Sequence, residues 1–345
     1  MTVSSPAATP VRPRNLMISL AARAFVKIGV LPVLVLVALV VFASMSDSFL
    51  TVENIHSALR QNSYIVIATL GQFIVLLTGG FDLSIGAVTA LVSVSSAMAM
   101  VAQGETSSPL TAVLVGIGVG LLVGMGCGLV NALGIATLNI NPFIMTLATA
   151  SAFSGLALML TSGVPVAGLP VEFSDWLGFN KILGIGVPIW IAALAAVGLW
   201  VLLTLTRPGR HIYSVGSSPK AAKLSGISEF RTLLLAYVAA GGLAAIGAVL
   251  LTARIETGEA NLGASLPLQT IAAAVIGGVS LRGGSGRVTD AVLGAVFIGI
   301  VANGMNLAQI NSYYQMIVTG TVLALAVVAD RLRNRLAVAV YAGKV

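Results

Sequence analysis

The sequence predicts an all-α polytopic membrane protein, and its composition, its apolar runs and the placement of its charges all point to that fold class. Of the 345 residues, 57% are hydrophobic and only 8% are charged, against about 25% charged residues in soluble globular proteins. The mean hydropathy is +1.03. So few charged side chains cannot cover the surface of a soluble protein of this length. We therefore expect a bundle of apolar helices that crosses a membrane.

Ten apolar runs are candidates for membrane-spanning helices, each of which needs about 20 mostly apolar residues. The runs cover residues 28–45, 61–79, 85–102, 110–130, 143–161, 185–205, 232–252, 268–280, 288–306 and 312–329. The run 85–102 is rich in Ser and Ala, and 268–280 is short for a full span. Ten spans are expected, with nine or eleven as the alternatives.

The basic residues test this count independently. If the N-terminus of a ten-span chain is cytoplasmic, all Lys and Arg residues except Arg60, Lys181 and Arg254 fall on the cytoplasmic side. Positive charge accumulates on the cytoplasmic side of membrane proteins, so both termini are expected there. The net charge of +7 then reports orientation in the membrane, and no nucleic-acid partner is expected.

The same reasoning divides the chain into three parts. Residues 1–27 are expected to be a cytoplasmic N-terminal segment, 28–331 the transmembrane region, and 332–345 a cytoplasmic tail.

Four glycines recur at every fourth residue of the fourth span. Gly116, Gly120, Gly124 and Gly128 therefore lie on one face of the expected helix, where they allow a neighbouring backbone to approach closely. Close helix packing is the favoured interpretation, and a flexible helix that lines a pore is the alternative.

A glycine-rich segment occurs twice along the chain. Gly79-Gly80-Phe81-Asp82-Leu83-Ser84-Ile85-Gly86 follows one apolar run, and Gly277-Gly278-Val279-Ser280-Leu281-Arg282-Gly283-Gly284 follows another. A weaker echo relates the region of Asn141 and Pro142 to that of Asn311. Two five-span halves of opposite topology are expected, because five is odd, and interrupted segments at matching places indicate a substrate path near their pseudo-twofold axis.

Asp82 has two interpretations. It could coordinate a cation or the substrate, because ionisable groups at membrane depth are often functional. We favour a helix cap near the cytoplasmic interface for the helix that starts at about Leu83, since a carboxylate satisfies free amide groups at a helix N-terminus. Asp290, near the start of the ninth span, has the same two interpretations.

The loop 206–231 carries five basic residues and the signature of a short helix. Ser218 is the expected N-cap, Pro219 suits the first helical position, and Gly226 is the expected C′ glycine. Between them lie Lys220, Ala221, Ala222, Lys223, Leu224 and Ser225. The loop could be a solvated basic segment, but a helix capped at both ends is more consistent with a docking element for a cytosolic partner.

No catalytic motif accompanies these features. The stretch Gly283–Thr289 has Arg in place of the P-loop Lys and the wrong spacing. His56 and His211 fall in loops on opposite sides of the membrane, so no metal site and no enzymatic activity are expected.

Several motifs together resemble the ribose/xylose/arabinose-type permeases of bacterial ATP-binding-cassette (ABC) importers. They are Leu77-Thr-Gly-Gly-Phe-Asp82-Leu-Ser-Ile-Gly86, Asn141-Pro-Phe-Ile-Met-Thr146, Tyr213-Ser-Val-Gly-Ser-Ser-Pro-Lys-Ala-Ala-Lys-Leu-Ser-Gly-Ile227 and Ala274-Val-Ile-Gly-Gly-Val-Ser-Leu-Arg-Gly-Gly284. The resemblance runs in order from about residue 28 to 331. Phe81 replaces the commoner Ile or Val of that family, which is a conservative change. Branched-chain amino acid permeases of the same superfamily are less similar over 213–227.

This resemblance implies an inner-membrane permease for a monosaccharide, such as a ribose-like pentose, a hexose or a related polyol. The implied partners are a second permease copy (the same chain or a different one), membrane lipid, a cytosolic ATPase with two nucleotide-binding halves, and a periplasmic or lipid-anchored sugar-binding protein. The chain itself would bind no cofactor, because ATP and Mg²⁺ are used by the ATPase. The 218–226 helix would be the coupling helix that docks on the ATPase.

A path for a neutral solute needs polar side chains without fixed charge, and Asn62, Gln72, Ser95 and Asn303 are of this kind. Other functions remain open at this point. The chain could be a secondary transporter coupled to Na⁺ or H⁺ through Asp82 and Asp290, a branched-chain amino acid permease, or a membrane scaffold without transport activity.

Overall fold

The structure is a computed structural model that describes residues 31–104, 107–311, 313–318, 320–321, 324–325 and 328. The predicted terminal segments, 1–27 and 332–345, lie outside the described residues, as do the first three residues of the predicted first span.

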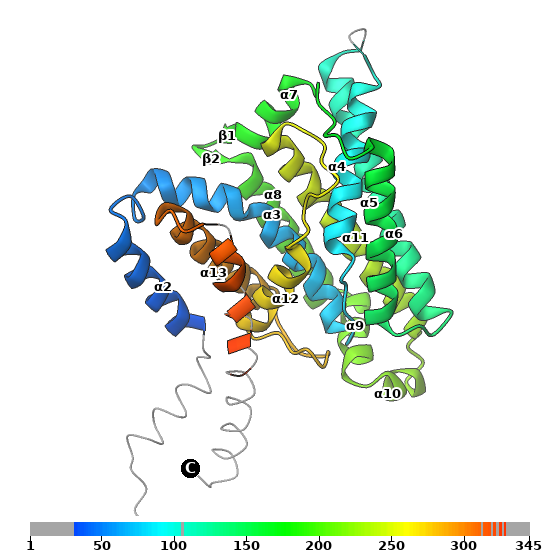
Figure 1. The fold of residues 1–345 in the computed structure, drawn as a ribbon. Coiled ribbons are helices and arrows are strands. Elements are labelled where there is room, and N and C mark those ends of the chain that lie inside the picture. The colour runs from blue at the N-terminus through cyan, green and yellow to red at the C-terminus, as the bar shows by residue number, and fades with distance from the viewer. Residues whose placement is uncertain are drawn as a thin grey trace, which may run out of the picture.

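The described part of the chain is built almost entirely from helices (Figure 1). In chain order these are α2 (Leu31–Met45), α3 (Val52–Leu77), α4 (Ile85–Val101), α5 (Pro109–Ala136), α6 (Pro142–Thr161), α7 (Val171–Ser174), the π-helix η1 (Asp175–Phe179), α8 (Val187–Leu205), α9 (Arg207–Ser217), α10 (Pro219–Leu224), α11 (Glu229–Ile255), α12 (Leu266–Gly277) and α13 (Val288–Leu307). Two short antiparallel strands, β1 (Lys181–Ile182) and β2 (Ile185–Gly186), form a hairpin before α8.

Five of the described helices, α5, α6, α8, α11 and α13, are both long enough and apolar enough to cross a membrane. The helices α2, α4 and α12 are apolar but shorter, and the 12 residues of α12 extend only about 18 Å at ~1.5 Å per residue. The predicted span 312–329 lies partly outside the described residues, and its described residues are helical. A multi-pass helical membrane protein is thus confirmed, while the count of ten spans remains a prediction.

Polar caps and prolines set the starts of many helices. The side chains of Thr51, Ser108, Asn141, Thr206 and Ser228 each accept a hydrogen bond from a backbone N–H in the first turn of the helix that follows. Such a cap satisfies one of the backbone donors that the first turn leaves free. Several of these helices also carry Pro in the first turn, where its missing N–H costs nothing.

The helices α3 and α11 lie at the centre of the bundle and pack against each other (Figure 1). Helix α11 also packs on α4 and α5, whereas α3 also packs on α12 and α13. Helix α6 covers α4, and α2 covers α13. Each central helix is therefore held by helices from the other end of the sequence.

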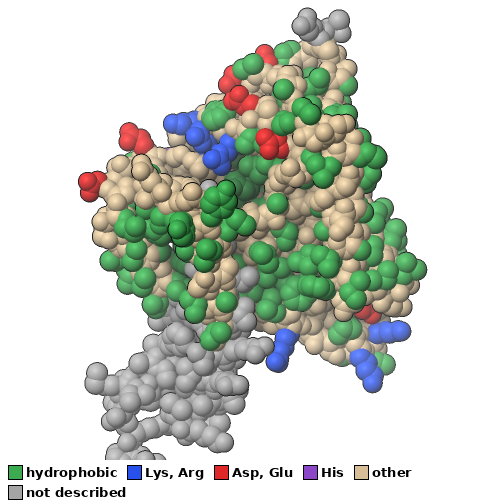
Figure 2. All heavy atoms as spheres, in the orientation of Figure 1, with side chains coloured by type: hydrophobic (Ala, Val, Ile, Leu, Met, Phe, Trp, Pro, Cys, Tyr) green, Lys and Arg blue, Asp and Glu red, His purple; other side chains and the backbone are tan. Residues whose placement is uncertain are grey.

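The two ends of the bundle differ in charge. Helices α9 and α10 lie at one end, and α7 with the β1–β2 hairpin lies at the opposite end (Figure 1). Figure 2 shows separate Lys and Arg side chains along the edge near α9 and α10, and most of the visible Asp and Glu side chains, together with a group of Lys and Arg, toward the α7 end.

The structure differs from the sequence expectations at three places. Helix α3 begins at Val52 rather than 61, because polar residues such as Glu53 and Arg60 continue the helix beyond its apolar part. Helix α4 starts at Ile85, where its apolar run begins, and two residues after the start at about Leu83 that was expected from Asp82 as a cap. The loop 206–231 contains a second helix, α9, which the sequence analysis did not predict.

The glycine stripe of α5 is a packing surface, as predicted. A Cβ atom at Gly128 would collide with the carbonyl oxygen of Tyr237 in α11, and one at Gly124 would lie 2.5 Å from the carbonyl oxygen of Gly241. Gly116 and Gly120 face side chains of α4. Backbone-to-backbone contact of this kind requires glycine, because any side chain would separate the two helices.

We expect Gly128→Ala to destabilise the protein by about 1–3 kcal/mol, the usual cost of overpacking a core. Gly126→Ala on the same helix is the matched control, because a Cβ atom there has no neighbour within 4 Å. Thermal unfolding in detergent measures both variants. Equal melting temperatures for the two would show that the stripe does not carry the α5–α11 contact.

Candidate functional site

The two glycine-rich segments, which are 200 residues apart in the sequence, meet in the structure. The first connects α3 to α4 and the second connects α12 to α13. The backbone N–H of Gly284 donates to the carbonyl oxygen of Leu77 at 2.9 Å, and a Cβ atom at Gly283 would lie 2.7 Å from the nitrogen of Gly79. Gly79 and Gly283 both have positive φ (80° and 84°), which favours glycine. The segments therefore touch through their backbones.

Helix α9 completes this contact. A Cβ atom at Gly216 would collide with the carbonyl oxygen of Leu77 and would lie 2.7 Å from the nitrogen of Gly284. We name Gly79, Gly216, Gly283 and Gly284 the glycine junction. Through it the predicted docking loop and both glycine-rich segments form one structural unit.

Tyr213 holds α9 on the same unit through its hydroxyl, which donates to the carbonyl oxygen of Gly286 at 2.9 Å. Burial, together with the nearby Asp290 carboxylate, raises the pKa of Tyr213. The hydroxyl therefore stays protonated at neutral pH and remains a donor.

Asp82 caps the start of α4 and begins a buried chain of polar side chains. Its Oδ1 accepts hydrogen bonds from the backbone N–H of Ser84 at 2.8 Å and from the Ser84 hydroxyl at 2.6 Å. The Ser84 Oγ accepts from Asn131 Nδ2 at 2.8 Å, and Asn131 Oδ1 accepts from the Thr149 hydroxyl at 2.6 Å. This chain, which joins α4, α5 and α6, is the polar network. Asp82 thus satisfies an N–H group at the start of α4, although the N-cap residue of this helix is Ser84. Asp82 is only 4% exposed, so it lies deeper in the protein than the predicted interface position.

Asp290 also caps a helix. It is the third residue of α13, and its Oδ2 accepts a hydrogen bond from the backbone N–H of Arg287 at 2.9 Å.

The motif that begins at Asn141 supports the first glycine-rich segment. Asn141 caps α6 and Pro142 is its first residue. One turn later, the hydroxyl of Thr146 accepts from the backbone N–H of Leu83 at 3.1 Å. Two motifs that are separate in the sequence therefore form a single contact.

Gly80 and Gly86 of the first glycine-rich segment have no room for a side chain. A Cβ atom at Gly80 would lie 2.5 Å from the hydroxyl of Tyr237, and one at Gly86 would collide with the carbonyl oxygen of Gly263.

The second segment shows the same tight packing, since a Cβ atom at Gly277 would collide with the carbonyl oxygen of Asp290, and Gly278 has φ +107°.

Helix α10 has the capping that its sequence predicts. The Ser218 hydroxyl accepts from the backbone N–H of Ala221 at 3.3 Å, and Pro219 is the first helical residue. At the other end Gly226 has φ +78°, and the backbone N–H of Ile227 donates to the carbonyl oxygen of Ala222 at 3.0 Å. This is the pattern of a Schellman C-cap.

One side of α10 faces away from the protein. Ala222 is buried, whereas Leu224 is 83% exposed, and Lys220, Ala221, Lys223 and Ser225 are exposed as well. Leu224 therefore lies exposed beside Lys220 and Lys223 on the outer side of α10.

A polar cavity of about 190 Å³ lies near the α7 end between α3, α11 and α13. Most of its side chains are polar: Gln61, Asn62, Tyr64, Arg254, Asn303 and Asn306. A larger cavity of about 510 Å³ lies beside the loop between α4 and α5, but there only Ser107 and Glu172 contribute polar side chains.

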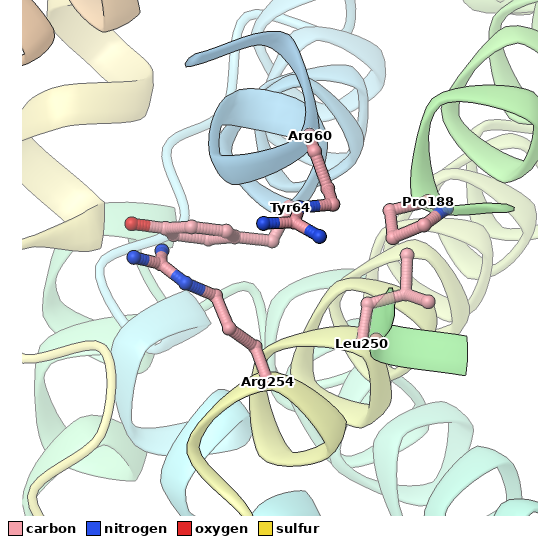
Figure 3. Close-up of a pocket in the computed structure, with 6 residues that line it drawn as sticks. Arg60, Tyr64, Pro188, Leu250 and Arg254 are labelled. Carbon is pink, nitrogen blue, oxygen red and sulfur yellow. The ribbon is translucent and has the colours of Figure 1, made fainter. Parts of the chain in front are cut away.

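A narrow neighbouring cavity shares Tyr64 and Arg254 with the polar cavity. Figure 3 shows the guanidinium groups of Arg60 and Arg254 reaching toward Tyr64 from α3 and α11. The Arg60 guanidinium also lies 5.3 Å from the ring centre of Phe179, within the range of a cation–π interaction. Two positive charges thus stand beside the polar cavity.

The four residues predicted to line a path fall in different places. Asn62 and Asn303 both line the polar cavity. Gln72 is fully buried, and with its amide nitrogen turned toward the carbonyl oxygen of Asp82 it donates there at 2.9 Å. Ser95 donates to the carbonyl oxygen of Val92 within its own helix at 3.2 Å. Gln72 and Ser95 therefore lie outside the polar cavity.

Comparison with known proteins identifies the family. Residues 54–327 match the family described as the branched-chain amino acid transport system / permease component. That match covers most of the chain. The chain belongs to this family.

Individual relatives carry more specific names. The permease is 40% identical to the ribose import permease protein RbsC of Bacillus subtilis (strain 168) over 305 residues, which are 88% of this chain and 92% of the relative. It is 35% identical to RbsC of Escherichia coli (strain K12) over the same shares. The D-allose transport system permease protein AlsC of Escherichia coli (strain K12) is 34% identical over 86% of this chain and 89% of the relative. No solved structure matches the permease.

The comparisons confirm the family resemblance that the motifs indicated. Together with the apolar helices, they identify the permease as a multi-pass protein of the bacterial inner membrane and as a transport subunit rather than an enzyme.

Several residues of these sites were not predicted from the sequence. The Thr206–Pro208 pair has the N-cap and proline signature of a helix start and could have revealed α9. Asn131 directly follows one apolar run and Thr149 lies inside another, and neither position indicated the polar network. Nor did hydropathy place Arg254 beside Tyr64.

We expect Asp82→Ala to destabilise the permease by about 1–3 kcal/mol, because it leaves the buried donors of Ser84 without an acceptor. Asp82→Asn keeps a carbonyl oxygen at Oδ1 and should unfold close to the wild-type temperature. Thermal unfolding in detergent distinguishes the two. A stable Asp82→Asn variant that cannot transport would contradict the cap and support a coordinating carboxylate.

Proposed function

We propose that the chain is the permease subunit of an ABC importer and forms the path for a monosaccharide, which is a pentose, a hexose or a related polyol. The observation that carries this proposal is the similarity, over nearly the whole chain, to permeases named for ribose and D-allose. A galactose/methyl galactoside import permease of Haemophilus influenzae is 32% identical over 86% of this chain. The relatives favour a sugar over a branched-chain amino acid.

The proposed topology has ten spans in two inverted halves of five, with both termini in the cytoplasm and the α10 end on the cytoplasmic side. The reciprocal packing supports two halves, because α11 packs on α4 and α5 in the way that α3 packs on α12 and α13. The exposed basic residues Arg207, Arg210, Lys220, Lys223 and Arg231 support the orientation through the positive-inside rule.

The proposed assembly contains two permease copies, identical or different, together with a cytosolic ATPase and an exported sugar-binding protein. In this assembly the permease binds no cofactor, and ATP and Mg²⁺ belong to the ATPase. Residues Ser218–Gly226 form the surface that docks on the ATPase. The exposure of Leu224 beside Lys220 and Lys223 supports this role.

The glycine junction supplies the route by which movement at α10 would reach the membrane region. Ser218 caps α10 and directly follows α9, and Gly216 of α9 contacts the ends of α3 and of the second glycine-rich segment. Helix α3 in turn lines the polar cavity through Asn62. ATP-driven closure of the ATPase would therefore move α9 and α3 together and alternate the access of the path.

Reconstitution tests the function directly. The permease, a candidate ATPase and a candidate binding protein are placed together with proteoliposomes, and ribose, D-allose and galactose are the first solutes. We expect import that requires ATP and the loaded binding protein. Import by the permease alone on a Na⁺ or H⁺ gradient would contradict the proposal and favour a secondary transporter.

We expect Leu224→Asp to lower co-purification of the ATPase with the permease about tenfold or more, because a charge would replace the apolar centre of the docking surface. Leu183→Asp is the matched control, since Leu183 is also highly exposed, at 89%, but lies in the β1–β2 hairpin at the opposite end. Both variants should fold like the wild type. Full retention of the ATPase by Leu224→Asp would exclude α10 as the docking surface.

A further inference from the structure

The first glycine-rich segment has a second match in the sequence, just after α11. Residues 78–83 read Thr-Gly-Gly-Phe-Asp-Leu, and residues 257–262 read Thr-Gly-Glu-Ala-Asn-Leu. The first stretch joins α3 to α4, and the second joins α11 to α12. Because α3 and α11 are the two central helices, the match relates the same connection in the two proposed halves. We name residues 256–265 the α11–α12 segment.

The helices that follow these stretches begin in the same way. Their N-cap residues have nearly equal backbone torsion angles, with φ −81° and ψ −12° at Ser84 and φ −88° and ψ −10° at Ser265. Five residues later, the hydroxyls of Thr89 and Thr270 each donate to the carbonyl oxygen four residues earlier, at 2.8 Å in both helices. The sequence match is therefore accompanied by a match in local structure.

The two matching connections also touch each other. Gly86 and Pro267 each stand two residues after the N-cap, and a Cβ atom at Gly86 would lie 3.1 Å from Cδ of Pro267. A Cβ atom at Gly263 would in turn lie 3.1 Å from the carbonyl oxygen of Gly86. Residues related by a twofold axis touch only where the axis passes between them. The α11–α12 segment thus ends near the proposed pseudo-twofold axis, where transporters with inverted repeats have their solute sites.

The α11–α12 segment is non-helical backbone that runs from the α7 end of the bundle to the start of α12 (Figure 1). A Cβ atom at Gly258 would lie 2.5 Å from the Cβ of Ala97 in α4, and near the end of the segment Gly263 meets Gly86. Ala97 and Gly86 are 11 residues apart in α4, which is about 16 Å of helix. The segment therefore extends about halfway through a hydrocarbon core of roughly 30 Å, and the 12 residues of α12 cover the remainder.

The segment exposes polar side chains at this depth. Asn261 and Ser265 are exposed, and Gln269, four residues further on, is partly exposed. Gln269 Nε2 donates to Ser265 Oγ at 3.2 Å, whereas the amide and the backbone N–H of Asn261 have no hydrogen-bond partner among the described residues. Lipid cannot satisfy such groups, and non-helical backbone at membrane depth occurs only where protein buries it or where it lines a water-filled cavity.

The two copies of the repeat differ in the side chain at their fifth position. In the first copy Asp82 is buried and accepts hydrogen bonds from Ser84. In the second copy Asn261 is exposed and neutral. Its amide can both donate and accept hydrogen bonds, and it carries no charge that would hold a polar solute too firmly to release. The first copy is therefore structural, while the second leaves its polar group available.

We propose that the α11–α12 segment and the first turn of α12 form a wall of the solute path in the outer half of the membrane, where Asn261, Ser265 and Gln269 contact the passing solute. This inference rests on the proposed function and deepens it, because it assigns residues to the path. Two amides and a hydroxyl offer donors and acceptors to the hydroxyl groups of a polyol. The neighbouring Leu268 is 59% exposed and provides an apolar contact for the C–H groups of the same solute.

Thiol labelling tests whether this wall faces water. The variants are Asn261→Cys and Ser265→Cys, and Ser151→Cys is the matched control, because Ser151 is an exposed serine of the apolar helix α6. The wild type measures the background from the one natural cysteine, Cys127, which is 5% exposed. The reagent is a positively charged methanethiosulfonate that does not cross the membrane. It is applied to intact cells, which present the α7 end, and to inside-out vesicles, which present the α10 end.

We expect Asn261→Cys and Ser265→Cys to be labelled about tenfold faster than Ser151→Cys in at least one of the two preparations. The reason is that the reactive thiolate forms in water, whereas a thiol in lipid stays protonated and out of reach of a charged reagent. The solute that the wild type imports, whether ribose, D-allose or galactose, should slow the labelling of Asn261→Cys when the loaded binding protein and ATP are present.

Import per ATP hydrolysed tests contact with the solute. In the complete importer we expect Asn261→Leu to lower this ratio about tenfold, the effect of losing one good hydrogen bond. Ser151→Leu should match the wild type. Stimulation of the ATPase by the loaded binding protein should persist in both variants, because neither residue lies in α10.

Labelling of Asn261→Cys and Ser265→Cys no faster than that of Ser151→Cys in both preparations would overturn the wall. A disulfide between two copies of Asn261→Cys, formed without any labelling, would overturn it as well and place the segment in a contact between permeases. If Asn261→Cys does not fold, Ser265→Cys decides against the same control. Wild-type import per ATP in Asn261→Leu would exclude contact with the solute. Absence of ATP-dependent import by the wild type would overturn the proposed function, whereas labelling decides separately whether the segment faces water.

Discussion

The contact between backbones at the glycine junction is the constraint on which the rest of the structure depends. The end of α3, the second glycine-rich segment and α9 approach so closely that a single Cβ atom at Gly216 or Gly283 would collide with the backbone of a neighbour. Among the described backbone hydrogen bonds, the one from the N–H of Gly284 to the carbonyl oxygen of Leu77 links the second glycine-rich segment to the end of α3. Side chains pack around the junction, but they do not form it.

Non-helical backbone inside a membrane protein must find its hydrogen bonds within the protein, because lipid supplies none. The segment between α3 and α4 solves this problem with side chains from distant helices. Asp82 and Thr146 accept from the backbone of Ser84 and Leu83, and the hydroxyl of Tyr237 donates to the carbonyl oxygen of Phe81. The polar network continues from Ser84 through hydrogen bonds to Asn131 and Thr149, and both of these side chains are neutral. The interruption between α3 and α4 is thus a fixed part of the fold.

The fold class, most helices and the caps of α10 could be predicted from sequence, because hydropathy, charge and capping are local signals. The polar start of α3 could not, since residues 52–60 lack the apolar character by which spans are recognised. Helix α9 was hidden for a related reason: it is an amphipathic helix whose buried residues, Ile212 and Val215, are sparse. The residues that line the polar cavity were even harder to predict from the sequence. Asn62 and Asn303 were suspected for their polarity alone, and nothing in the sequence shows that they share a cavity with Arg254. Gln72, equally polar, instead serves the backbone of Asp82.

Ser218 determines how stiff the connection between α9 and α10 is. This one residue ends α9, through its backbone N–H bonded to the carbonyl of Ser214 at 3.1 Å, and begins α10, through its hydroxyl. A flexible linker between these helices would absorb a displacement of α10 as changes in backbone torsion angles. Ser218 is the single residue between the helices, and because its backbone N–H and its hydroxyl are both hydrogen-bonded, its torsion angles can change little. A displacement of α10 would reach Gly216 across only two residues, so α9 and α10 would move together against the end of α3.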